Sequence, residues 1–176
     1  MAAALTLTTP DVAAQAQTSN ITPTFVQPTA DLSSRRLTPE ALWSMGRIGD
    51  VSLTPDGKQA FYSVTYYSIE KNKSQSIIRT CPTDGSRTAT TAPILVNAYS
   101  PTALPGGQRI AYMSAASGTM QVWSANLDGS DARQMSDEAD GIDGYRFSPD
   151  GSRVILVKSV PQHHSIAAKE PDLPLS

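Results

Sequence analysis

A turn signature occurs three times along this chain of 176 residues, and each copy introduces an apolar, β-prone segment. The three copies are Pro55-Asp56-Gly57-Lys58, Pro105-Gly106-Gly107-Gln108 and Pro149-Asp150-Gly151-Ser152. Their prolines, at positions 55, 105 and 149, lie 50 and then 44 residues apart. A strand–turn–strand unit that repeats at about this period is typical of a β-propeller blade. The chain is therefore predicted to be a row of blades.

A second signal has the same period. Asp84-Gly85-Ser86 and Asp128-Gly129-Ser130 are 44 residues apart, and each follows an expected strand. Asp-Gly pairs tolerate the positive φ angles of tight turns, so they favour hairpins. Two independent turn signals at one spacing strengthen the prediction of a structural repeat.

The strand pattern predicts an all-β fold, a partial β-propeller with WD40-like or TolB-like (PD40) blades. In the first blade, strands are expected near 48–53, 59–69, 75–81 and 92–96. In the second blade, strands are expected near 98–104, 109–114, 120–127 and 132–136. The third blade begins at Ile142, and its second strand, 152–160, ends at Pro161. The propeller of residues 37–161 thus has about two and a half four-stranded blades, near 43–97, 98–137 and 142–161.

A short helix is expected just before the first blade. Thr38 can cap its N-terminus, and Pro39 suits the first helical position. Glycines at 46 and 49 limit the helix to one or two turns. We expect Leu42 and Met45, with Trp43, to pack this helix onto the first blade.

The two ends of the chain differ in composition from the middle. Residues 1–36 are interpreted as a truncated signal-peptide remnant and a disordered lead-in, because Ala14-Gln15-Ala16 fits the small-x-small pattern before a signal-peptidase cut. A flexible tail without signal function is the alternative. Residues 162–176 carry Pro171 and Pro174 and are interpreted as a truncated loop or insertion. A signal remnant predicts a periplasmic or secreted protein.

Charge and motif content exclude several function classes. With 14 basic and 16 acidic residues, the chain has no basic patch for nucleic acid or a membrane surface. Its single cysteine, Cys81, cannot form an internal disulfide. No Gly-x-Ser-x-Gly elbow occurs, and Ser86, Ser130 and Ser152 lie in hairpin turns. We therefore predict no catalytic, cofactor-binding or metal-binding residue in this chain.

Two groups of residues remain as weaker candidates. The histidines, His163 and His164, are adjacent in a polar segment near proline and are expected to be exposed to solvent. An acidic stretch of four carboxylates joins the second and third blades: Asp137, Glu138, Asp140 and Asp143. It is either a site for a cation or a substrate amine, or a solvated loop, and its spacing lacks the calcium-loop pattern.

The segments Leu37–Trp43 and Gly46–Lys58 resemble the opening of the prolyl oligopeptidase family (peptidase family S9), closest to its bacterial dipeptidyl-peptidase 5 and acylaminoacyl-peptidase type. The segments Val122–Ser130 and Phe147–Ser152 are similar to the repeats of this family and also to those of TolB-type propellers. The resemblance covers roughly residues 37–176.

The resemblance implies an N-terminal propeller that restricts entry of short peptides to a C-terminal α/β-hydrolase domain with a Ser-Asp-His triad. No triad residue can be assigned here, so the chain alone is expected to be inactive, and its partner would be the hydrolase domain of the parent protein. A second copy of the chain is a further candidate partner. Two alternatives stay open: a non-catalytic TolB-like module that binds proteins in the periplasm, and a pseudogene product or misassembled gene model.

Overall fold

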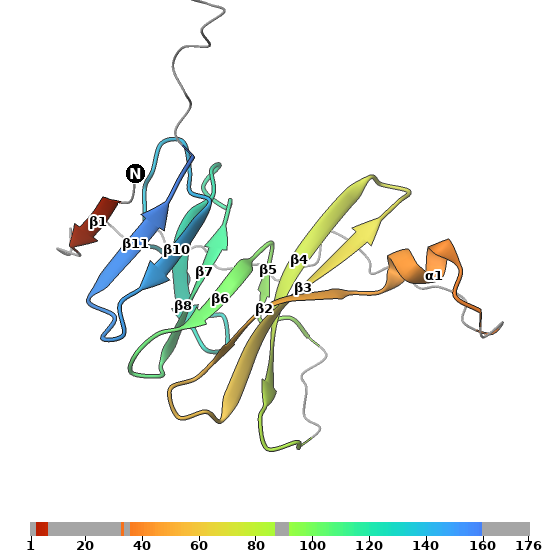
Figure 1. Ribbon diagram of the computed structural model, residues 1–176, viewed down its shortest axis with the longest axis horizontal. Coiled ribbons are helices and arrows are strands. Elements are labelled where there is room, and N and C mark those ends of the chain that lie inside the picture. The colour runs from red at the N-terminus through yellow and green to blue at the C-terminus, as the bar shows by residue number, and fades with distance from the viewer. Residues whose placement is uncertain (1–2, 7–32, 34–35, 87–91, 160–176) are drawn as a thin grey trace, which may run out of the picture.

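Three antiparallel sheets follow one another along the chain (Figure 1). The computed structural model describes residues 3–6, 33, 36–86 and 92–159. In the first sheet the strand order is β2 (Arg47–Leu53), β3 (Gln59–Ser68), β4 (Lys73–Pro82) and β5 (Leu95–Val96). In the second sheet it is β6 (Tyr99–Ala103), β7 (Arg109–Ser114), β8 (Gln121–Asn126) and β9 (Arg133–Gln134). Both sheets have four strands in sequence order, as in propeller blades, so the predicted partial β-propeller is confirmed.

The third sheet contains β10 (Gly144–Phe147) and β11 (Arg153–Val157), and its remaining strand comes from the other end of the chain. Strand β1 (Ala3–Thr6) runs antiparallel to β11, with Ala3 opposite Leu156. It occupies the position that β4 and β8 take in the first two blades. Sequence analysis did not predict this strand. Most of the lead-in, the histidine pair and the tail 162–176 lie outside the described residues.

The repeated turns form as their sequences predict. Asp56 accepts hydrogen bonds from Thr54 Oγ1 at 2.6 Å and from the Lys58 amide at 3.1 Å. Gly57 follows with φ of +69°, a region that glycine enters without steric cost. Asp150 makes the equivalent contacts in the third blade, where it accepts hydrogen bonds from the Ser148 hydroxyl and the Ser152 amide. Each turn reverses the chain, so that the next strand pairs with the one before it.

Two apolar clusters hold the blades together. Successive side chains of a strand point to opposite faces of the sheet. Ile110 and Tyr112 of β7 accordingly pack with Phe61 of the first blade, whereas Ala111 and Met113 pack with the third blade. The larger cluster also contains Ile78, Leu95, Trp123 and Ala125, and the smaller one contains Val122, Ile142, Val154 and Leu156. The core thus lies between blades.

Helix α1 (Pro39–Ser44) forms where it was predicted, with the Thr38 hydroxyl accepting a hydrogen bond from the Ala41 amide at 3.1 Å. The predicted packing is wrong in part, because Leu42 and Met45 are exposed and Ala41 is the buried residue of the helix. A helix of six residues has fewer than two turns. It therefore buries a single position rather than an apolar stripe.

Trp43 connects the helix to the first blade through aromatic contacts. Its ring meets the Tyr67 ring edge-on, with the ring centroids 5.8 Å apart. The Arg47 guanidinium lies 5.1 Å from the Trp43 centroid and 4.7 Å from the Tyr67 centroid. Such cation–π contacts contribute about 0.5–1 kcal/mol each at exposed sites. The helix is therefore held by this cluster and by Ala41.

Candidate functional site

A line of hydrogen bonds joins the first strands of all three blades. Ser100 Oγ on β6 donates to Asp50 Oδ2 on β2 at 2.8 Å. The Tyr145 hydroxyl on β10 donates to the Ser100 carbonyl oxygen at 2.6 Å and lies 3.2 Å from Thr102 Oγ1. In a propeller the blades surround a central channel. We call Asp50, Ser100 and Tyr145 the inner-strand line.

Two β-bulges place the first two members of this line. The pairing of β2 with β3 shifts between Ile48 and Val51, and that of β6 with β7 shifts between Tyr99 and Thr102. Asp50 and Ser100 lie inside these irregular segments. Ser100 has φ of +49°, which is uncommon for a residue other than glycine. A bulge re-aims side chains relative to a regular strand, so the bulges direct the two residues toward the neighbouring blade.

Burial raises the pKa of the Tyr145 hydroxyl well above its usual range. The hydrogen bond with Thr102 opposes this shift, and the negative charge of Asp50 adds to it. The hydroxyl therefore stays protonated at neutral pH and remains a donor. Asp50 is exposed to solvent, so the inner-strand line presents a carboxylate and polar groups. This arrangement can orient a polar ligand; the Ser100 hydroxyl in it is paired with the Asp50 carboxylate, and none of the three residues is a histidine.

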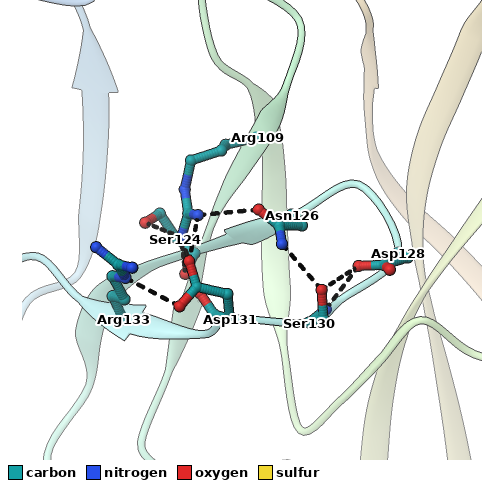
Figure 2. Close-up of polar contacts among 7 residues, drawn as sticks. All are labelled: Arg109, Ser124, Asn126, Asp128, Ser130, Asp131 and Arg133. Carbon is teal, nitrogen blue, oxygen red and sulfur yellow. Dashed lines mark hydrogen bonds and ion pairs between the residues drawn. The ribbon is translucent and has the colours of Figure 1, made fainter. Parts of the chain in front are cut away.

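The serines that follow the Asp-Gly pairs are hydrogen-bonded within their own turns. Figure 2 shows Ser130, whose amide and hydroxyl donate to Asp128 Oδ1 at 2.9 and 2.6 Å. These hydrogen bonds hold the pKa of Asp128 below its usual value. The amides of Ser86 and Ser152 make the same contact with the aspartates two residues earlier. Each hydroxyl group therefore belongs to a turn.

Arg109 forms hydrogen bonds that link strands of the second blade (Figure 2). Its guanidinium donates to Asn126 Oδ1 at 3.0 Å and to Asp131 Oδ2 at 2.8 Å, and it also reaches the Ser124 carbonyl. Arg133 donates to the other Asp131 oxygen at 3.0 Å. The hydrogen bond from Arg109, followed by that from Arg133, holds the pKa of Asp131 below its usual value. The cluster ties β7, β8 and β9 together.

Two residues of the acidic stretch form an ion pair and hydrogen bonds with neighbouring residues of the second and third blades. Glu138 forms an ion pair with Lys158 at 3.0 Å, and its backbone amide donates to Gln121 Oε1 at 3.1 Å. Asp143 accepts a hydrogen bond from Ser159 Oγ at 2.7 Å. Within the described residues, no group of three or more metal-binding side chains comes together. These contacts favour the interpretation of the stretch as a solvated connecting loop.

A cleft of about 450 Å³ lies between the turns of the first two blades. Its lining includes Asp56, Lys58, Gly107 and Leu127. The hydrogen bond from Thr54 holds the pKa of Asp56 below its usual value. A cleft of this size accommodates a small polar group, but its walls are turn residues that already bond one another.

No helix in the described part of the chain is long and apolar enough to cross a membrane.

The chain is similar in sequence to two curated dipeptidyl-peptidases. Dipeptidyl-peptidase 5 of Porphyromonas endodontalis is 37% identical over 140 residues, which is 80% of this chain and 20% of that protein. Dipeptidyl-peptidase 5 of Porphyromonas gingivalis is 37% identical over 128 residues, which is 73% of this chain and 19% of that protein. No family model matches the sequence.

A solved structure with a similar fold is the acylaminoacyl peptidase of Pyrococcus horikoshii. Its TM-score to this chain is 0.56 at 25% sequence identity, over 75% of this chain and 20% of that structure. The chain thus spans about a fifth of the length of the curated relatives it matches. The sequence and structural similarities both point to the blade region of large peptidases.

Proposed function

We propose that this chain, a propeller part of an S9-family peptidase, is the N-terminal propeller portion of a secreted or periplasmic dipeptidyl-peptidase. In this proposal it controls the access of peptides to an α/β-hydrolase domain. The observation that carries the proposal is the 37% identity over 140 residues to a dipeptidyl-peptidase. The similarity to a second such enzyme and to an acylaminoacyl peptidase supports it.

The chemistry of the described residues supports a role in access rather than in catalysis. The inner-strand line offers an exposed carboxylate at Asp50 and a fixed hydroxyl donor at Tyr145. Peptide hydrolysis by a serine enzyme proceeds through an acyl-enzyme formed by a nucleophile, a base and an oxyanion site. We assign these groups to the hydrolase domain, and we assign to the propeller the exclusion of substrates too large for its channel.

A chimaeric enzyme tests this role. The segment of the P. endodontalis dipeptidyl-peptidase 5 that matches this chain is replaced by the chain's own residues. Release of dipeptides from a short chromogenic peptide and cleavage of a casein-sized protein are then measured. A matched control carries blades of an unrelated propeller in the same position.

We expect the chimaera to cleave the short peptide and to exclude the protein substrate. Labelling with a fluorophosphonate reports separately whether the serine is reactive, so a misfolded chimaera is recognised. A chimaera that is labelled normally, but that admits the protein substrate as freely as the control does, contradicts the proposal.

A further inference from the structure

The turn between the first two strands of the second blade differs from its two sister turns. In the first and third blades the turns are Thr54–Lys58 and Ser148–Ser152, and each has an aspartate at its middle position. In the second blade the turn is Leu104–Gln108, and its middle residue is Gly106. All three turns close with the same backbone hydrogen bond, from the following glycine amide to the carbonyl three residues earlier. The turns are thus equivalent in the fold, and the second one lacks a carboxylate.

The aspartate carboxylate binds a backbone amide in each sister turn. Asp56 Oδ1 accepts a hydrogen bond from the Lys58 amide at 3.1 Å, and Asp150 Oδ1 accepts one from the Ser152 amide at 3.1 Å. The amide at the equivalent position of the second blade belongs to Gln108. It donates to no acceptor among the described residues. The fold therefore places this amide as a donor that a carboxylate from outside the turn can use.

The glycine at position 106 also leaves space beside this amide. Gly106 has φ of +96°, as expected for the third residue of a type II turn that follows a proline. Neither Asp56 nor Asp150 has a positive φ. A Cβ atom at Gly106 would meet no atom of the described residues within 4 Å. The backbone of this turn thus disfavours a side chain of its own, and the space next to Gln108 stays accessible.

This space belongs to the cleft of about 450 Å³ between the first two blades. The second-blade turn, with Gly107 and Gln108, forms one wall, and the first-blade turn, with Lys58, forms the other. The walls lie close together, because a Cβ atom at Gly107 would lie 3.7 Å from Pro55 Cδ. The hydrogen bonds of Asp56 belong to the first-blade wall alone. The cleft therefore combines a free amide with an ammonium group, and both kinds of donor bind carboxylates.

Asp56 decides which carboxylates suit the cleft. It lies on the same wall as Lys58, so it would repel an anion that brings no donor with it. Its Oδ1 atom accepts hydrogen bonds from Thr54 and from the Lys58 amide, whereas its Oδ2 atom accepts none from the residues that the structure describes. A carboxylate with an N–H group on the adjacent carbon offers Asp56 a donor. The C-terminal residue of a peptide has this combination.

We propose that the cleft binds the C-terminal end of a short peptide. The peptide carboxylate takes, at the Gln108 amide, the place that an aspartate oxygen has in the sister turns. Lys58 balances the charge of the carboxylate, and the N–H group of the last peptide residue donates to Asp56. The site is complete within the first two blades, so it does not depend on the hydrolase domain of the proposed function.

The test is an NMR titration of the full chain, labelled with ¹⁵N, with three small probes. N-acetylglycine has both the carboxylate and the N–H group, propionate lacks the N–H group, and N-acetylglycinamide lacks the carboxylate. We expect N-acetylglycine to move the Gln108 amide resonance in a saturable way. Each of the other two probes should bind about tenfold more weakly or worse, because each loses a hydrogen bond to a charged group.

Two variants and a control locate the binding. The double variant L104S/G106D rebuilds the sister turn in the second blade, so its own carboxylate should occupy the Gln108 amide and abolish binding. Lys58→Gln should weaken binding severalfold. The control Lys73→Gln removes the same charge from an exposed position on β4 that does not line the cleft, and it should bind as the wild type does.

Three results would overturn the proposal. The first is a wild-type chain whose Gln108 amide shows no saturable shift. The second is equal affinity for N-acetylglycine and propionate, which would mean that any small anion binds. The third is undiminished binding by a double variant whose remaining amide resonances show the native fold. The comparison of probes uses the wild-type chain alone, so it decides the question even if the double variant does not fold.

Discussion

Gly129 and Gly85 occupy the same Asp-Gly-Ser turn in two different blades, and substitution by alanine should affect them very differently. Both glycines have positive φ, +85° and +78°. A Cβ atom at Gly129 would lie 2.1 Å from the Ile94 carbonyl oxygen, whereas a Cβ at Gly85 would meet no atom of the described residues within 4 Å. The pair therefore separates the cost of backbone conformation from the cost of contact between blades.

The expected magnitudes follow from this geometry. Both substitutions incur about 1–2 kcal/mol for a left-handed backbone with a Cβ atom. At Gly129, the Ile94 oxygen must also move away from 2.1 Å to beyond 3.0 Å. Ile94 donates to the Ile78 carbonyl beside β5, so this shift strains the edge of the first blade. Overpacking of this kind adds about 1–3 kcal/mol.

Urea unfolding of both variants at one protein concentration provides the measurement. Gly129→Ala should lower the free energy of unfolding by about 2–5 kcal/mol, and Gly85→Ala by about 1–2 kcal/mol. Equal losses for the two variants would refute the reasoning, because they would mean that the second-blade turn does not contact the first blade.

Two further predictions concern the cluster between the first two blades. Phe61→Ala should lower the free energy of unfolding by about 3–5 kcal/mol, because Phe61 is fully buried. The control, Ile69→Ala on the exposed turn, should change it by less than about 0.5 kcal/mol. Chemical denaturation of both variants measures the difference. Burial raises the pKa of Tyr112 to about 12, so its contribution to stability is complete below pH 10 and is lost as the pH rises towards 12. Tyr112→Phe should therefore reduce the alkaline slope of the unfolding free energy by up to about 1.4 kcal/mol per pH unit, and an unchanged slope between pH 9 and pH 12 would contradict this.

Strand positions could be predicted closely because local signals specify them. The predicted strand 109–114 matches β7 residue for residue, and the prediction 120–127 extends one residue beyond β8 at each end. Each strand from β2 to β11 is bounded by a turn whose glycine or asparagine enters positive φ, as at Asn72 between β3 and β4. Turn residues of this kind are visible in the sequence, so the alternation of apolar residues and the turn residues predict the same strand boundaries.

The inner-strand line could not be predicted, because it depends on contacts between blades. Asp50 and Ser100 are 50 residues apart, and Tyr145 is a further 45 residues along the chain. The β-bulges that aim the first two residues have no distinctive composition beyond Gly49. The packing of α1 was missed for a related reason. Trp43 is held by contacts with Arg47 and Tyr67, and the spacing of apolar residues in the sequence does not indicate cation–π contacts of this kind.

The most direct test of the proposed function is made on the native protein in its source cells. An antibody against residues 92–159 captures the protein, and the mass and dipeptidyl-peptidase activity of the captured species are measured together. The account predicts a species several times heavier than 18.7 kDa that releases dipeptides and reacts with a fluorophosphonate. A captured species of 18.7 kDa per chain with no such activity would contradict it.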